Sequence, residues 1–229
     1  MEINKDILVV GAENTGKTTL LHYFTDEDEQ EEIQKTLGME VYVQVDDQES
    51  KSMTYYELSG VASNIKEIAE TYIQVEKFDG IIAVFDLYNT KTVDHIFKIL
   101  EIYENASRIE NEAHIEEGQG VFDLPLLIIG NKKDLIHNER RVKQLVNELI
   151  NNIRKKFGSL FGNGQNIFYS ATGLPSSAMK VQSTKRQFDV EGFEKFSDML
   201  FRSGRLPPVQ AQEENNEKTP SLRERFLFF

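Results

Sequence analysis

The stretch that decides the fold is "ILVVGAENTGKTTLLHYF", residues 7–24. It starts as an apolar run, passes through a glycine loop that ends on Gly16, Lys17 and Thr18, and finishes in a helical pattern. The loop fits G-x(4)-G-K-[ST], in which main-chain N–H groups and a helix N-terminus surround a phosphate. Since the pattern stands between a strand-like and a helix-like segment, as this mechanism requires, the sequence predicts a phosphate-binding loop.

Each residue of the loop has an expected contact. Lys17 is expected to bridge the outer phosphates of a nucleotide, and the Thr18 hydroxyl to ligate Mg²⁺. The loop and the first helical turn are expected to supply these further nucleotide contacts: Glu13, Asn14, Thr15, Gly16 and Thr19.

Strands and helices alternate along the rest of the chain. Strands are predicted over 3–10, 39–45, 53–58, 80–87, 124–131 and 166–171, and helices over 18–24, 63–74, 92–109, 139–157 and 190–201. Continuous apolar runs such as "GIIAVFDL" are typical of central parallel strands. The order predicts an α/β fold with a doubly wound, mostly parallel six-stranded sheet, which binds ligands at the carboxyl ends of its strands.

The 229 residues suit one domain with loops and a tail. We expect the domain to span residues 1–204, with surface insertions near 104–123 and 158–166, and a flexible tail over 205–229. The tail ends in "RERFLFF". Docking on a protein surface, in this chain or a partner, and shallow peripheral contact with a membrane all remain open for this apolar end.

Composition narrows the class of partner. The formal net charge of −12 disfavours nucleic-acid binding, which needs clustered Lys and Arg. The chain has no cysteine, which excludes disulfides, thiolate zinc sites and prenyl or palmitoyl anchors. With no signal-peptide pattern and no long apolar stretch, a cytoplasmic protein without a lipid anchor is expected.

A second motif, "GNKKD" at 130–134, directly follows a predicted buried strand. The Asp134 carboxylate can accept from both N1–H and the 2-amino group of guanine, whereas adenine offers no matching pair of donors. Asn131 is expected to reach N7 of the base and to tether the phosphate loop. The stem of Lys132 is expected to lie over the base plane.

A third motif, "YSAT" at 169–172, ends the next predicted strand. Ser170, Ala171 and Thr172 are expected beside the base, with the Ala171 N–H directed at O6. Each tetrapeptide is a weak signal alone. In this order, each after a strand, the motifs together predict a guanine-nucleotide site.

On these motifs the sequence resembles the Ras superfamily of small GTPases over roughly residues 3–203. Thr36 matches the switch I threonine of that superfamily, and the segment from Glu57 to Gly60 matches the entry to switch II. The resemblance implies GTP/GDP switching with Mg²⁺ held by Thr18, Thr36 and Glu57. It also implies that Lys17, Thr36 and Gly60 take part in GTP hydrolysis.

Placement within the superfamily rests on shorter stretches. "GAENTGKTTLL" is similar to an Arf-like phosphate loop, whereas "VFDLYNTKTVDHI" is similar to Rab proteins. The long segment before "LPLLIIGNKKD" and the cysteine-free C-terminus resemble the Rab-like protein 3 group. We therefore expect an atypical Rab-like member.

Three departures from the superfamily pattern concern hydrolysis. Val61 stands where the superfamily has the glutamine that orients the attacking water, and a branched alkyl group cannot hydrogen-bond to water. Glu57 replaces an aspartate that holds Mg²⁺ through water. Glu13 places a carboxylate where many relatives have a small residue. Weak GTP hydrolysis to GDP is expected, unless a neighbouring side chain or a partner protein orients the water.

Two functions fit these features. The first is a GTP/GDP switch that regulates trafficking or assembly through effector and regulator proteins. The second is a nucleotide-bound scaffold, whose surface and tail bind partners without switching. A P-loop kinase or ATPase is disfavoured because Asn131 and Asp134 would then have no purpose.

Overall fold

The computed structural model describes residues 3–25, 36–46, 50–61, 66, 71–73, 78–114, 124–136, 138–173, 187–188 and 190–202. Most of the helix predicted over 63–74 lies outside these residues, although Lys66 and 71–73 are helical. The acidic segment 26–32, the second half of the insertion expected near 104–123 and the tail from 205 onward also lie outside them.

The six predicted strands form one sheet, to which a two-residue strand is added at the edge. The strands are β1 Ile3–Val10, β2 Met39–Asp46, β3 Lys51–Leu58, β4 Gly80–Asp86, β5 Leu126–Asn131, β6 Ile167–Gly173 and β7 Gln187–Phe188. Their order in the sheet is β2-β3-β1-β4-β5-β6-β7. Strands β3, β1, β4, β5 and β6 run parallel, and β2 and β7 pair antiparallel with their neighbours. The predicted doubly wound, mostly parallel α/β fold is confirmed.

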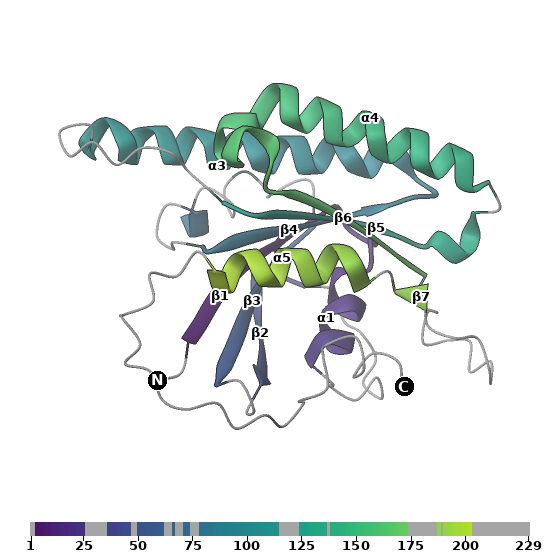
Figure 1. The fold of residues 1–229 in the computed structure, drawn as a ribbon, viewed down its shortest axis with the longest axis horizontal. Helices are drawn as coiled ribbons and strands as arrows, with labels where there is room; N and C mark the ends of the chain where they lie inside the picture. Colours follow the sequence, from purple (N-terminus) through teal and green to yellow (C-terminus); the bar gives the residue numbers. More distant parts are fainter. Residues whose placement is uncertain are drawn as a thin grey trace, which may run out of the picture.

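Helices cover both faces of this sheet. They are α1 Lys17–Thr25, α3 Val93–His114, α4 Glu139–Phe157 and α5 Val190–Arg202. Helices α3 and α4 lie side by side on one face, while α1 and α5 lie on the other (Figure 1). Short 3₁₀ turns lie in the connections between strands and helices: η1 Thr90–Thr92, η3 Lys133–Leu135, η4 Gly158–Leu160 and η5 Gly162–Gly164. Within the described residues, no helix combines the length and the apolar character needed to cross a membrane.

Local sequence explains where α4 and α3 end. Helix α4 has the predicted bounds because Asn138 caps its first turn, accepting from the Arg141 N–H at 3.2 Å, and because Gly158 follows its last residue. Helix α3 continues to His114, five residues past the predicted end at 109. Glu and Ala in the added turns are good helix formers, so the helix runs past the end that the apolar pattern predicts.

The segment 158–166, expected as a surface insertion, is anchored in the core. Its two 3₁₀ turns bring Leu160 and Phe161 inside, where both side chains are buried. Arg154 of α4 donates to the carbonyl oxygen of Gly164 at 3.2 Å and fixes the far end of the segment. This stretch is therefore a packed connection between α4 and β6.

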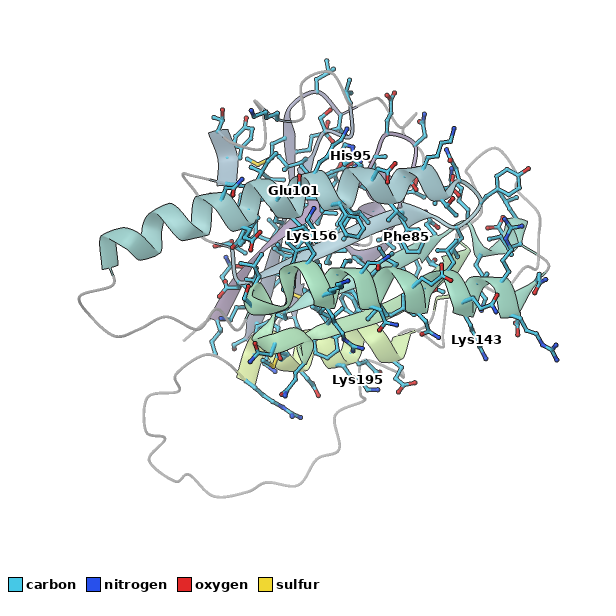
Figure 2. The ribbon with its side chains drawn as sticks, turned by 90° about the horizontal axis from the view of Figure 1, so that it is seen from above. Phe85, His95, Glu101, Lys143, Lys156 and Lys195 are labelled. Atoms are coloured by element: carbon cyan, nitrogen blue, oxygen red, sulfur yellow. The ribbon has the colours of Figure 1, made fainter. Side chains whose placement is uncertain are left out.

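The core is divided by the sheet into two layers. Ile81, Ala83 and Phe85 of β4 pack toward α3 and α4, while the alternate residues Ile82 and Val84 pack toward α1 and α5. A strand buried on both faces needs a continuous apolar run, which "GIIAVF" supplies. Figure 2 shows Phe85 beneath the helical layer.

Helices α3 and α4 are also joined at their outer surfaces. Lys156 of α4 pairs with Glu101 of α3 (Figure 2). The Lys156 ammonium also lies 5.9 Å and 5.2 Å from the ring centroids of Phe97 and Phe157. These partly exposed contacts fix how the two helices lie on the sheet.

The parallel strands all finish at the same end of the sheet, which we call its carboxyl end. The glycine loop after β1, the turn after β4, the motif after β5 and the end of β6 meet there. At the opposite end of the sheet, where β1 and β4 begin, Lys5 pairs with Asp79 at 2.9 Å. The three predicted nucleotide motifs therefore lie together at the carboxyl end of the sheet, where doubly wound sheets bind ligands.

Candidate nucleotide-binding site

The loop after β1 closes tightly against the motif after β5. Gly16 has a φ of +85°, and a Cβ there would lie 2.3 Å from Nδ2 of Asn131, so glycine is required on both counts. Asn14 also takes a left-handed conformation, with a φ of 61°. The Asn131 amide donates to the carbonyl oxygen of Thr15 at 2.8 Å. The structure thus contains the predicted tether between the base motif and the phosphate loop.

Lys17, the first residue of α1, folds back over the glycine loop. Its ammonium donates to the carbonyl oxygens of Gly11 at 3.1 Å and Ala12 at 3.3 Å, and lies 3.8 Å from Oε1 of Glu57. Burial lowers the pKa of Lys17, and the negative charges of Glu57 and Glu13 oppose that shift. The Lys17 ammonium is therefore a buried positive charge next to the glycine loop, where it would offset the negative charge of a bound phosphate.

Three oxygen-bearing side chains from separate segments meet beside Lys17. Oε1 of Glu57, on β3, accepts from the hydroxyls of Thr18 at 2.9 Å and Thr36 at 3.4 Å. Glu57 is almost fully buried, and its Oε2 atom has no hydrogen-bond partner in the described part of the chain. Burial raises the pKa of Glu57, against the opposing effects of Lys17 and the Thr18 hydrogen bond.

This group fits a magnesium ion. Mg²⁺ prefers hard oxygen ligands and is commonly held by one or two protein groups together with phosphate oxygens and water. Two hydroxyls and a carboxylate with an unpartnered, buried oxygen match that preference. Thr18, Thr36 and Glu57 are thus the residues that would hold the ion.

Glu40 belongs to the same network, although the sequence alone did not single it out. It lies directly across from Glu57 in the antiparallel β2–β3 pair. Its Oε2 atom accepts from the Tyr42 hydroxyl at 2.9 Å and from Thr36 at 3.4 Å. No local signal pointed to Glu40, because the alternating valines 41, 43 and 45 would place it on the solvent face of the strand, whereas the structure exposes those valines.

Gly60 packs against the phosphate loop. Its carbonyl oxygen accepts from the Glu13 N–H at 3.0 Å, and a Cβ at Gly60 would lie 2.3 Å from that nitrogen. The next residue, Val61, is half-buried and carries no polar side-chain atom. The Glu13 side chain is exposed.

The base end of the site lies at the tips of β5 and β6. Asp134 is exposed on η3 and faces the end of β6, because a Cβ at Gly173 would lie 3.2 Å from its Oδ1 atom. Ser170, Ala171 and Thr172 are buried at that end of β6. The Thr172 hydroxyl is buried without a partner in the described residues. A buried hydroxyl without a partner and an exposed carboxylate, both at the carboxyl end of the sheet, are compatible with a polar ligand at this position.

Asp86, at the carboxyl end of β4, is a further residue that sequence reasoning missed. It forms an ion pair with Lys132, with 2.7 Å between Oδ2 and Nζ. The two residues are 46 positions apart, so no local pattern connects them. The signal that was available is a carboxylate closing a buried strand at the ligand edge of the sheet.

His95 is a third residue that the sequence alone did not single out. It projects from α3 (Figure 2) and is buried, with its Nε2 atom unpartnered within the described structure. Burial lowers its pKa to about 4, and the charges of Lys17 and Lys98 add to that shift. A neutral imidazole therefore lies in the neighbourhood of the phosphate loop.

A glycine loop, a buried lysine, a hydroxyl–carboxylate network and a base motif tethered to the loop together define a P-loop nucleotide-binding protein of the GTPase type. The Ras family model matches residues 6–161, and the chain belongs to the Ras family. That match spans the phosphate loop, Thr36, Glu57, Gly60 and the base motif.

Individual relatives point to the same branch of the superfamily. The chain is similar to Rab-like protein 3 of Mus musculus, with 28% identity over 188 residues, covering 75% of this chain and 76% of the mouse protein. It is also 28% identical over 151 residues to Rab-like protein 3 of Bos taurus, covering 59% of this chain and 63% of the bovine protein. The resemblance to a Rab-like small GTPase, drawn from the motifs, is confirmed.

Proposed function

We propose that this small GTPase is a slow GTP/GDP switch that acts in the cytoplasm through effector and regulator proteins. The observation that carries the proposal is the contact of Gly60 with Glu13, because it places Val61 beside the phosphate loop without a polar group. The site keeps the groups that bind nucleotide and lacks the side chain that orients water. Regulation of trafficking or assembly is proposed by analogy with Rab-like relatives.

The phosphate end is proposed to work through charge and oxygen ligands. Lys17 binds the outer phosphates, with main-chain groups and side chains of the loop and first turn completing the cradle. Thr18, Thr36 and Glu57 hold Mg²⁺, which when bound offsets the negative charge of the phosphates. Residues proposed for the cradle are Glu13, Asn14, Thr15, Gly16 and Thr19.

The base end is proposed to select guanine. Asp134 accepts from the base edge, Asn131 reaches N7 while tethering the loop, and Lys132 covers the base plane. Ser170, Ala171 and Thr172 line the opposite side, where the Thr172 hydroxyl has no protein partner in the described residues. A nucleotide without the guanine donors would leave Asp134 unpaired in the complex.

Hydrolysis requires water to attack the γ-phosphorus in line with the bond to the β-phosphate oxygen, which breaks to release GDP. Gly60 and Lys17 are proposed to stabilise charge on the γ-phosphate. Val61 can neither accept a proton from that water nor hold it in place. The rate is therefore expected to fall well below that of relatives with glutamine at this position.

Switching is proposed to reach partners through β2. Thr36 lies three residues before this edge strand, and its hydroxyl contacts Glu57 of the site. Val41, Val43 and Val45 each expose about half of their surface along one side of β2. A row of exposed apolar side chains on an edge strand is a surface that a protein partner would cover.

The experiment is to denature the purified protein, identify the released nucleotide, and then time γ-phosphate loss from a GTP-loaded sample in a single turnover. We expect guanine nucleotide and slow hydrolysis that depends on Mg²⁺. Bound adenine nucleotide, or no nucleotide uptake in the presence of Mg²⁺, would contradict the site. Hydrolysis as fast as in glutamine-containing relatives would contradict the proposed slow rate.

A second function, a nucleotide-bound scaffold, is favoured by one observation. Protein groups alone, Glu40 and Glu57, already hydrogen-bond to the Thr36 hydroxyl. Such contacts give the Thr36 hydroxyl protein partners of its own. Partner binding that is equal for the GDP-loaded and GTP-loaded protein would favour the scaffold, and a clear difference would favour the switch.

A further inference from the structure

We propose that Asp86 is a positioning residue for the guanine base, which it serves by pinning the Lys132 ammonium so that the lysine stem is held ready to cover the base plane. The inference rests on the proposed guanine-nucleotide site and assigns it a component outside its three sequence motifs. Asp86 itself has no contact with the nucleotide in this arrangement.

The two carboxylate oxygens of Asp86 have separate partners. Oδ1 accepts from the main-chain N–H groups of Tyr88 at 2.8 Å and Asn89 at 3.2 Å, which shapes the turn after β4. Oδ2 accepts from the Lys132 ammonium at 2.7 Å. Asp86 is only 6% exposed, so this charge is committed to partners within the protein.

Lys132 is fixed at both of its ends. Its main-chain N–H donates to Oδ1 of Asn131 at 2.7 Å, and its backbone takes a left-handed conformation with a φ of 62°. At the other end, the ammonium is held by Asp86. The methylenes between these two anchor points therefore have little rotational freedom, although the side chain remains 32% exposed.

The strand ends keep the two anchor points at a constant separation. Asp86 lies directly opposite Asn131 in the β4–β5 pair, and the Leu87 N–H donates to the carbonyl oxygen of Asn131 at 3.0 Å. Asn131 is in turn tethered to Thr15 of the phosphate loop. The lysine stem thus has a fixed place relative to both the base motif and the phosphates.

A preordered stem lowers the entropic cost of binding. Immobilising a long side chain on association typically lowers affinity by a factor of roughly 2 to 12. Without Asp86, Lys132 would be ordered only when the nucleotide arrives. We therefore expect loss of the ion pair to accelerate GDP release about three- to tenfold.

The test is the GDP dissociation rate of an Asp86→Asn variant, measured with a fluorescent GDP analogue. Asparagine keeps an Oδ1 acceptor for the turn and removes the charge that holds Lys132. The same change is made in a Lys132→Met background, where the apolar stem remains but the ammonium is absent. We expect Asp86→Asn to act in the wild-type background and to change the rate less than about twofold in the Lys132→Met background.

The chain offers a matched control at the other end of the sheet, where the parallel strands begin. Asp79 and Lys5 form an ion pair of similar length, 2.9 Å, far from the candidate site along the strands. Asp79→Asn is expected to leave GDP release unchanged. A further readout compares GDP with IDP, which lacks the 2-amino group. Stacking by Lys132 does not depend on that group, so Asp86→Asn should accelerate the release of both nucleotides by the same factor.

A measurement on proteins that keep Asp86 covers the case in which Asp86→Asn fails to fold. The ion pair is partly exposed and is screened by salt, so release should accelerate with ionic strength more in the wild type than in Lys132→Met.

The outcomes separate this inference from the proposed function. If the wild-type protein binds no guanine nucleotide, the proposed function fails and takes the inference with it. If it binds GDP but Asp86→Asn releases it at the wild-type rate, the inference alone fails. An equal effect of Asp86→Asn in both backgrounds also overturns it, because Asp86 would then act through the β4 turn.

Discussion

The two ends of the candidate site differ in how closely they keep the pattern of the Ras family. At the base end, the residues at 131, 132 and 134 match the superfamily motif, and Asn131 is bonded to the phosphate loop. At the phosphate end, Glu57 and Val61 replace the usual aspartate and glutamine. The difference separates two tasks that one site performs: holding a nucleotide and hydrolysing it.

The two ends of the site also differ in how far their ion pairs are buried. The base end holds Lys132 in a short, partly exposed ion pair with Asp86. The phosphate end buries Lys17 and Glu57 3.8 Å apart, with Oε2 of Glu57 unpartnered in the described residues. A buried, incompletely satisfied charge network is costly by itself and gains most from a ligand that completes it. We infer that nucleotide and Mg²⁺ stabilise the phosphate end more than the base end.

The largest expected effect falls at the base end, on guanine selectivity. Asp134→Asn replaces the carboxylate that is proposed to accept two hydrogen bonds from guanine. The asparagine amide turns its own N–H group toward one of the two guanine donors. Hydrogen bonds to a charged group contribute about 1.5–3 kcal/mol each, so GDP affinity should fall by at least about 100-fold. Competition between GDP and ADP measures the loss of preference. The exposed Glu139→Gln, at the start of α4, is the control and should bind as the wild type does; equal GDP affinity in Asp134→Asn would contradict the base assignment.

The second prediction concerns the pH dependence of stability, to which we expect His95, near the phosphate end, to contribute. His95 has a pKa of about 4 in the folded protein and about 6.5 in an unfolded chain. The unfolded state therefore binds the proton more readily, and His95 costs stability as the pH falls below its unfolded pKa. From pH 7 to pH 5 this amounts to about 2 kcal/mol of unfolding free energy. Urea unfolding of the wild type and His95→Gln at both pH values measures it.

His95→Gln should flatten that dependence by about the same amount. Glu57 titrates in the opposite sense, because burial raises its pKa, and it does so in both proteins, so the difference between them isolates His95. His22→Gln on α1 is the control variant. An unchanged slope in His95→Gln would show that the imidazole is not held neutral.

How much of this could be read from the sequence depends on the range of the interactions involved. The bounds of β1 and α4 were predictable because an apolar run, an Asn cap and a following Gly are local signals. The two-residue strand β7 was not, since it exists only through pairing with the end of β6. The segment 158–166 was expected at the surface because its glycines and polar residues outweighed Leu160 and Phe161.

The same distinction holds in the candidate site. The motif residues could be predicted because phosphate and guanine recognition require fixed residue types at fixed spacings. Asp86 and Glu40 were missed because their roles come from strand register: Asp86 lies opposite Asn131, and Glu40 lies opposite Glu57. Register brings together residues that are far apart in the chain, and a single sequence does not reveal it.

The third prediction restores the missing group at the phosphate end. Val61→Gln introduces an amide that can accept from and donate to the attacking water, so single-turnover GTP hydrolysis should rise about tenfold, equivalent to about 1.4 kcal/mol of barrier. Glu13 remains beside Gly60 and limits the gain. Val61→Leu has a similar reach without polar atoms and should hydrolyse as slowly as the wild type. An equal gain in both variants would mean that side-chain length, not hydrogen bonding, limits the rate.

The smallest effect concerns the metal ligand itself. Oε1 of Glu57 accepts directly from the Thr18 hydroxyl at 2.9 Å, so the longer side chain brings the carboxylate up to the hydroxyl that is proposed to ligate the ion. Glu57→Asp withdraws the carboxylate by one methylene, which gives a water more space between the carboxylate and the ion. Mg²⁺ binding through water should then tighten, and the Mg²⁺ concentration that half-suppresses GDP release should fall about three- to fivefold, less than one factor of ten or about 1.4 kcal/mol. Glu57→Gln, which keeps the length and removes the charge, should shift it the other way. If Glu57→Asp instead weakens Mg²⁺ binding, the longer side chain is itself the better ligand, and the phosphate end is adapted to hold its ion tightly while hydrolysing slowly.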